Sequence, residues 1–142
     1  MKYLAIDYGQ KRIGVAASDD GGNIAFPRIT LHKTTKDMLF AQLLDLITKD
    51  KIEALVVGLP VPDDGVENLT TKQVRNFTES LKRRVELPIF FMPETLSSFA
   101  ADQSLRSAGL YSQDRNKYSD QAAAVEILNS FLSLPSERRI KA

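Results

Sequence analysis

The apolar residues of this 142-residue chain change their spacing about a quarter of the way along, and this change constrains the fold most. Before it lie short apolar runs separated by turn residues, a pattern typical of antiparallel strands joined by hairpins. The expected strands are Tyr3 to Ile6, Ile13 to Ala17 and Asn23 to Leu31. From Lys36 onward, apolar residues recur at helical spacing, and helices then alternate with short apolar runs.

The later part of the chain predicts four helices and two buried strands. The expected helices are Lys36 to Thr48, Glu67 to Arg84, Ser97 to Ala108 and Asp120 to Leu132, and the expected strands are Ile52 to Val57 and Pro88 to Met92. A meander followed by strand–helix alternation predicts an α/β fold with a mixed five-stranded sheet flanked by helices. Neither a linker nor a repeat divides the sequence, so we expect one domain over residues 1–142.

Composition narrows the functional classes. The chain has no cysteine, which excludes disulfides and thiolate metal sites and favours the cytoplasm. No apolar stretch is long enough to span a membrane, and Asp7 comes too early for a signal peptide. The net charge of +1 lacks the strongly basic character that is typical of nucleic-acid-binding proteins. Basic residues form local groups that matter only if the fold gathers them on one face: Lys11-Arg12, Lys82-Arg83-Arg84, Arg115 with Lys117, and Arg138-Arg139 with Lys141.

Three acidic residues occupy unusual positions. Asp7 ends one apolar strand, Glu94 follows another, and Asp120 begins an apolar helix. Ligand sites of open α/β sheets lie beyond strand ends, so Asp7 and Glu94 are expected to meet there. Carboxylates without Cys or His suit Mg²⁺ or Mn²⁺ rather than zinc. Two such ions about 3.5–4 Å apart activate water and stabilise the leaving oxygen in phosphodiester cleavage.

Each acidic residue also has a simpler interpretation. Asp7 can begin the turn before Gly9, Glu94 can be an exposed loop residue, and Asp120 can support a helix N-terminus. His32, the only histidine, fits an ordinary polar position better than a metal ligand. The carboxylates alone are therefore only a suggestion of a site.

Four motifs in order strengthen that suggestion. The stretch DYGQKRIGVA from Asp7 to Ala16 resembles the opening motif of the YqgF family, a Holliday junction resolvase-like group also described as pre-16S rRNA nucleases. Three later stretches resemble its other motifs: Val56 to Pro60 with Asp64-Gly65; Glu94 with Leu96-Ser97-Ser98 and Ala100; and Asp120-Gln121 with Ala123-Ala124 and Ile127-Leu128. Arg75, Phe77 and Leu81 match the helix between the second and third motifs.

The resemblance implies a ribonuclease H-like fold, akin to the RuvC-type resolvases. It implies that Asp7, Glu94 and Asp120 are catalytic and hold Mg²⁺ or Mn²⁺, with two ions expected. It also implies a nucleic-acid partner: the 5′ region of precursor 16S rRNA, with four-way DNA junctions as the alternative. Whether the protein is a monomer or a dimer stays open.

Several basic residues are candidates for binding that nucleic acid. Lys11 and Arg12 at the predicted hairpin tip are expected to contact its backbone, although a plain charged tip is the alternative. Arg75, Arg115 and Lys117 are the further substrate-binding candidates.

Glycines near the motifs have expected roles of their own. Gly9 is expected to allow a sharp turn, and Gly14 the close approach of a backbone or a phosphate. Gly58-Leu59-Pro60 either shapes the rim of the site or ends a strand. Asp63 and Asp64 are interpreted as loop residues.

The chain departs from the family at Thr95, where an arginine usually follows the glutamate. Threonine cannot supply the two hydrogen bonds of an arginine fork to phosphate. Arg115 or Lys117 can substitute, or the protein cuts weakly and serves as an RNA-binding relative. An ATP-binding fold of the actin and sugar-kinase type is a further alternative, because its phosphate-binding hairpin also contains Asp-x-Gly. Such proteins clamp the nucleotide between two domains, however, and we expect only one domain here.

Overall fold

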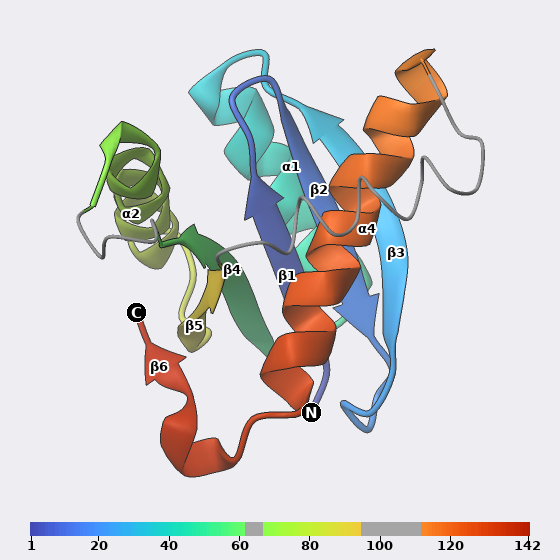
Figure 1. The fold of residues 1–142 in the computed structure, drawn as a ribbon, viewed down its shortest axis with the longest axis vertical. Helices are drawn as coiled ribbons and strands as arrows, with labels where there is room; N and C mark the ends of the chain where they lie inside the picture. The colour runs from blue at the N-terminus through green and yellow to red at the C-terminus, as the bar shows by residue number, and fades with distance from the viewer. Residues whose placement is uncertain (62–66, 95–111) are drawn as a thin grey trace.

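A computed structural model describes residues 1–61, 67–94 and 112–142, with only the helical backbone over 112–119. Within these ranges a six-stranded sheet carries helices on both faces (Figure 1). The strands are β1 (Tyr3–Tyr8), β2 (Arg12–Ser18), β3 (Ala25–His32), β4 (Ala54–Pro60), β5 (Ile89–Glu94) and β6 (Ile140–Lys141). The described helices are α1 (Lys36–Lys49), α2 (Leu69–Lys82), α4 (Ser112–Leu132) and a 3₁₀ turn at Ser136–Arg138.

The sheet is mixed, in the order β3-β2-β1-β4-β5-β6. The meander β1-β2-β3 pairs antiparallel, β1 pairs parallel with β4, and β4 pairs parallel with β5. The short β6 closes the other edge antiparallel to β5. Because β1, β4 and β5 run in the same direction, their carboxyl ends lie at the same edge of the sheet.

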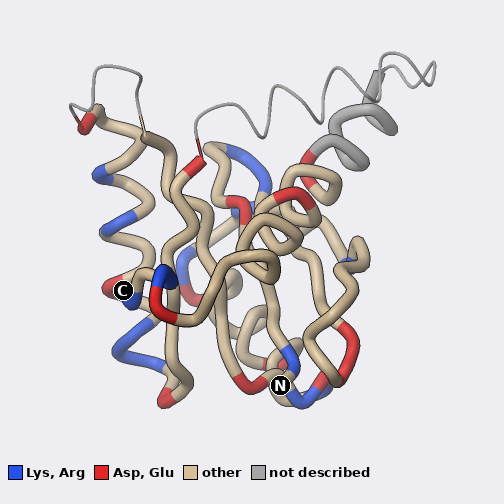
Figure 2. Tube along the Cα trace, turned by 60° about the horizontal axis from the view of Figure 1, so that its bottom comes forward, with Lys and Arg blue, Asp and Glu red and all other residues tan. Residues whose placement is uncertain are grey.

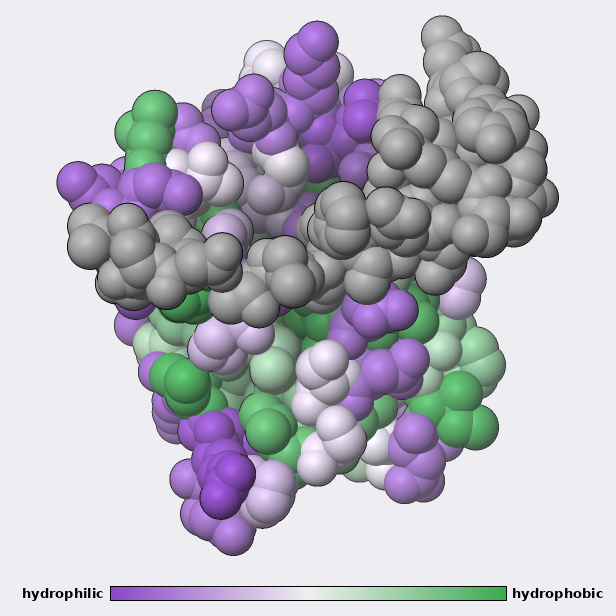
Figure 3. Space-filling view, viewed as in Figure 1, coloured by the Kyte–Doolittle hydropathy of each residue, from purple (hydrophilic) through white to green (hydrophobic). Residues whose placement is uncertain are grey.

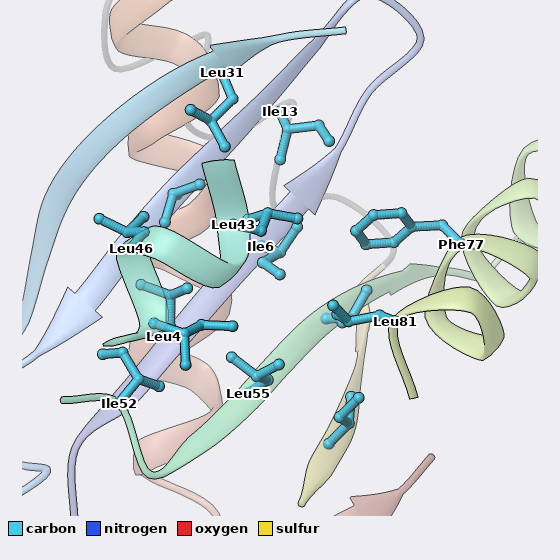
Figure 4. Packing of buried hydrophobic residues seen from close by; sticks show 14 of the residues in the cluster. Leu4, Ile6, Ile13, Leu31, Leu43, Leu46, Ile52, Leu55, Phe77 and Leu81 are labelled. Atoms are coloured by element: carbon cyan, nitrogen blue, oxygen red, sulfur yellow. The ribbon is translucent and has the colours of Figure 1, made fainter. Parts of the chain in front are cut away.

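The two faces of the sheet bury different side chains. Along β1, Leu4 and Ile6 pack into the cluster that contains the buried residues of α1 and α2. Tyr3 and Ala5 belong to the cluster that α4 covers. Side chains alternate between faces along a strand, so central strands covered on both faces need apolar residues at almost every position. Figure 4 shows the α1/α2 side, with Phe77 and Leu81 of α2 directed toward Ile6 and Leu55.

Polar caps fix the starts of α1 and α2. The Thr35 hydroxyl accepts a hydrogen bond from the Met38 amide at 3.1 Å, and Asn68 Oδ1 accepts one from the Thr71 amide at 2.9 Å. Thr71 also donates from Oγ1 to the Pro60 carbonyl at 2.9 Å, which fastens α2 to the carboxyl end of β4. The start of α2 is therefore anchored near the edge where the parallel strands end.

The predicted strands and three of the predicted helices are present, with shifted ends. The predicted sheet of five strands lacked β6, because this two-residue strand is too short to show any apolar period. The last helix begins at Ser112 rather than at Asp120. The prediction missed its first turns because the residues there are polar and show no apolar period. Asp120 therefore lies inside α4, and its interpretation as the N-terminal residue was wrong. The helix expected from Ser97 to Ala108 lies outside the described residues.

Basic residues do not gather on one face of the described ranges: Figure 2 shows basic and acidic segments dispersed along the whole trace. Some of them are part of the packing, since the Arg84 guanidinium lies 4.1 Å from the ring centre of Phe40 and that of Arg139 lies 4.5 Å from that of Phe131. None of the helices in the described ranges combines the length and the apolar character that crossing a membrane requires.

Candidate active site

Asp7 lies inside β1, directly opposite Gly14 of β2. Because Asp7 pairs within the strand, its interpretation as the start of a turn was wrong. It shares strand parity with Tyr3 and Ala5, so its side chain is on the face that α4 covers.

Glu94 is the last residue of β5 and pairs with Pro60 of β4, so it is not an exposed loop residue. Its parity matches that of Phe90 and Met92, which pack toward the α4 cluster. A Cβ atom at Gly58 of β4 would lie 3.1 Å from Glu94 Oε1 and 2.4 Å from Cδ1 of Ile127. Gly58 thus keeps free the space that Glu94 and α4 occupy, and it shapes the rim of the site within a strand that continues to Pro60.

Asp120 reaches the same face from α4. A Cβ atom at Gly14 would lie only 1.9 Å from the Asp120 carbonyl oxygen, so Gly14 permits α4 to lie directly on β2 at this residue. The close approach expected at Gly14 is therefore that of a backbone. Gln121 strengthens the contact by donating from Nε2 to Thr30 Oγ1 at 3.1 Å, across to β3.

Glu94 and Asp120 lie close enough to Asp7 to affect its ionisation. The pKa of Asp7 is raised from 3.8 to about 7, first by burial and then by the negative charges of Glu94 and Asp120. A partly buried carboxyl group with two acidic neighbours is costly to ionise without a nearby cation. Such an arrangement is frequent at functional sites.

Arg12 supplies one cation to this cluster. Its Nε donates to Asp120 Oδ2 at 2.7 Å, and both side chains are partly buried. The contact joins the start of β2 to α4 across 108 positions of the chain. Arg12 was predicted to contact a nucleic-acid backbone, and the structure adds that it holds one of the acidic residues.

The donor set matches a hard divalent cation in its chemistry, because all three candidate ligands are carboxylates. As the side chains are placed, no group of three or more His, Cys, Asp or Glu residues in the described ranges is arranged to hold a metal ion. Asp120 already contacts the Arg12 guanidinium through Oδ2, so an ion shared with Asp7 and Glu94 would lie near this positive charge.

The other predicted substrate-binding residues have different surroundings. Lys11 is exposed at the tip between β1 and β2. Arg75 of α2 pairs with Glu67 and lies over the ring of Phe91, away from the carboxylates. Arg115 and Lys117 belong to α4, where only the backbone is described. His32 is exposed on β3. The motif residues Thr95, Leu96, Ser97, Ser98 and Ala100, and also Asp63, Asp64 and Gly65, lie outside the described residues.

Comparison with known proteins identifies the family. Residues 1–134 match the family described as "RuvX: Holliday junction resolvase". A protein of Nitratidesulfovibrio vulgaris, named "Putative pre-16S rRNA nuclease", is 56% identical over 142 residues and covers all of both chains. A protein of the same name from Oleidesulfovibrio alaskensis is 50% identical, over 99% of this chain and 97% of its own.

The chain belongs to the RuvX family. This confirms the resemblance to the YqgF family that the sequence motifs carry. It also decides against the ATP-binding alternative.

The fold agrees with this membership. RuvC of T. thermophilus, solved in complex with a Holliday junction substrate, superposes with a TM-score of 0.62 over the full length of both chains at 14% identity. The ribonuclease H-like fold expected from the resemblance is thereby confirmed. This RuvX protein carries Asp7 near the carboxyl end of β1, Glu94 at the carboxyl end of β5, and Asp120 on α4, the helix that covers their face of the sheet.

Proposed function

We propose that this protein is a divalent-metal-dependent nuclease that trims the 5′ region of precursor 16S rRNA in the cytoplasm. The observation that carries the proposal is that Asp7 of β1, Glu94 of β5 and Asp120 of α4 share one face of the sheet, near enough for the last two to raise the pKa of Asp7. The family supplies the reaction class, and the names of the relatives supply the substrate.

Asp7, Glu94 and Asp120 would hold one or two Mg²⁺ or Mn²⁺ ions. Such ions activate water and stabilise the leaving oxygen of a phosphodiester when bound. Asp7 is the central ligand in this proposal, because its burial and its acidic neighbours give its ionised form most to gain from a cation.

The basic residues near the hairpin tip would hold the nucleic-acid backbone. Lys11 is exposed and Arg12 is partly buried beside Asp120, so the two lie at the margin of the carboxylate cluster. Hydrophilic side chains gather at the end of the molecule where this tip lies (Figures 1 and 3). We propose that Arg115 and Lys117 of α4 also contribute, and that Arg75 contacts more distant phosphates.

A DNA four-way junction is the second candidate substrate, favoured by the family description and the RuvC-like fold. Resolution of a junction needs two symmetric cuts and hence a dimer. A third candidate is an RNA-binding protein that cuts weakly, because Thr95 replaces the usual arginine.

One cleavage assay at fixed salt separates these candidates. Wild-type protein and Asp7→Asn are incubated with a precursor 16S 5′ leader and with a four-way DNA junction, each with Mn²⁺, Mg²⁺ or EDTA. We expect metal-dependent cleavage of the RNA that the substitution abolishes. Junction cleavage alone would favour the second candidate, and RNA binding without cleavage the third.

A further inference from the structure

A pocket opens on the opposite face of the sheet from the carboxylates. It has a volume of about 400 Å³ and lies between the β1–β2 tip and the first halves of α1 and α2. Its lining includes Tyr8, Gln10, Lys33, Lys36, Gln73 and Asn76. This volume is within the range of about 300–1,000 Å³ typical of pockets for small ligands.

We propose that this pocket takes one unpaired nucleotide of the RNA strand whose backbone reaches the carboxylates. That the ligand belongs to this RNA strand rests on the proposed function, whereas the existence of a binding site is argued from the chemistry of the pocket.

One wall of the pocket is already ordered. Tyr8 stacks on Phe77 with ring centres 4.4 Å apart, and Phe77 stacks on Phe40 at 5.6 Å. Cations cover both ends of this column: Lys33 Nζ lies 4.2 Å from the centre of the Tyr8 ring, and Arg84 covers Phe40. A preformed wall favours binding, because little side-chain freedom is lost when a ligand enters.

The charged groups of the pocket favour an anion. Lys33 Nζ donates to the Gly9 carbonyl at 3.3 Å, and Lys36 is exposed at the start of α1. Neither lysine forms an ion pair with a carboxylate of the described ranges, and no acidic residue lines the pocket there. Their charges thus remain available to a phosphate group.

The neutral polar groups favour a base. The side chains of Gln10, Gln73 and Asn76 are exposed, and within the described ranges their carboxamide groups make no hydrogen bond. Each carboxamide offers donors and an acceptor, which is what the hydrogen-bonding edge of a nucleobase requires. The pocket thus combines lysines for a phosphate, carboxamides for a base and aromatic side chains as an apolar wall. A phosphorylated nucleoside needs this combination.

The position of the pocket links it to the cleavage site. Asp7 and Tyr8 are adjacent in β1, so one faces α4 and the other lines the pocket. Among the described residues, the hairpin tip connects the two sites: Gln10 borders the pocket, Lys11 is exposed and Arg12 contacts Asp120. A strand that passes over this tip must turn around the end of the sheet, which a flexible unpaired strand does more readily than a stiff duplex. The occupant is accordingly an unpaired nucleotide.

Binding measurements in EDTA test this inference without any cleavage. The probes are a short fluorescent unpaired RNA and an RNA duplex of the same composition, at one fixed salt concentration. The pocket variants are Asn76→Ala and Lys36→Gln, both at exposed positions. The matched control is Lys72→Gln, which removes one exposed charge from α2 outside the pocket lining.

Each pocket variant should weaken binding of the unpaired RNA about threefold to tenfold, the effect of one hydrogen bond or charged contact. Lys72→Gln should change it less than about twofold, and all three should affect the duplex equally little. Losses equal to that of Lys72→Gln, or equal losses for the two RNAs, would overturn the inference. Competition with free AMP tests whether the pocket binds a nucleotide of a strand or a soluble nucleotide. Displacement of the RNA by micromolar AMP would contradict binding of the strand.

The two proposals can fail independently. If the protein cuts neither RNA nor DNA while the pocket variants lose unpaired RNA selectively, the nuclease proposal fails and the pocket stands. If it cuts the precursor and the pocket variants bind like the control, the pocket inference fails and the nuclease stands.

Discussion

Arg12 and Asp120 form a 2.7 Å hydrogen bond between the start of β2 and α4, so a cation of the protein itself holds one of the three site carboxylates. In this position the guanidinium offsets part of the negative charge that the carboxylates concentrate. A divalent ion bound by Asp120 would share the charge of this carboxylate with Arg12, and the two cations would repel each other. In the proposed function, Arg12 therefore connects metal binding with contact to the nucleic-acid backbone.

Removing this positive charge should strengthen metal binding. Arg12→Gln is expected to tighten Mn²⁺ binding up to about tenfold, because a nearby positive charge is lost, and to weaken RNA binding in EDTA. The Mn²⁺-dependent rise in Tm and RNA anisotropy measure the two effects. Arg28→Gln is the matched control, since Arg28 pairs with Asp50 at 2.8 Å elsewhere. Equal Mn²⁺ responses in the two variants would contradict this repulsion.

The raised pKa of Asp7 makes the stability of the metal-free protein depend on pH. Its folded value of about 7 exceeds its ordinary value of 3.8, so between these values the folded state binds the extra proton. Stability from this group is full below about pH 4 and is lost as the pH rises to about 7. Each pKa unit corresponds to about 1.4 kcal/mol, so the loss reaches a few kcal/mol.

Asp7→Asn removes this loss, because the amide stays neutral at every pH. In EDTA the variant should melt above wild type at pH 8, and the difference should vanish toward pH 4. Asp20→Asn, at an exposed position, is the control. A difference in Tm between Asp7→Asn and wild type that is constant with pH would show that Asp7 ionises normally in the folded protein.

The same carboxyl group should make metal binding depend on pH. A cation must displace the proton of Asp7 below about pH 7, so affinity for Mg²⁺ and Mn²⁺ should fall as the pH drops through that value. Titration calorimetry at pH 8 and pH 5.5 would measure this dependence. Asp7→Asn should show little binding at either pH. Strong metal binding by this variant would remove Asp7 from the ligand set.

Much of the site could be predicted from the sequence, because its residues carry local signals. Asp7 and Glu94 follow apolar runs, and the parallel strands that bear them end at one edge of the sheet. Period-two alternation then places both side chains on the α4 face. Asp120 could be predicted as a site residue from its motif, but not its depth in α4, since the residues before it lack an apolar period.

The remainder depends on contacts between distant elements. Arg12 and Asp120 are 108 positions apart, and nothing in either neighbourhood indicates the other. The pocket likewise draws its lysines from the end of β3 and the start of α1, and two of its carboxamides from α2. The sequence at Gly58 fitted two interpretations: β4 does end at Pro60, and the nearness of Glu94 to Gly58 becomes visible only in the structure.

Gly14 provides the most direct test of how α4 positions Asp120. In Gly14→Ala, the added Cβ would lie 1.9 Å from the Asp120 carbonyl oxygen, and backbone at this distance cannot yield without moving the helix. Overpacking of this kind lowers the free energy of unfolding by about 1–3 kcal/mol. The shift of Asp120 should reduce cleavage more than the loss of stability explains.

Gly21→Ala is the matched control, because its added Cβ would meet only the end of the Asn23 side chain, at 2.8 Å. That side chain can move, so unfolding and cleavage should stay near wild type. Urea unfolding and single-turnover cleavage at a temperature where both variants are folded separate the two effects. Full cleavage by folded Gly14→Ala would show that the site does not need Asp120 where α4 now holds it.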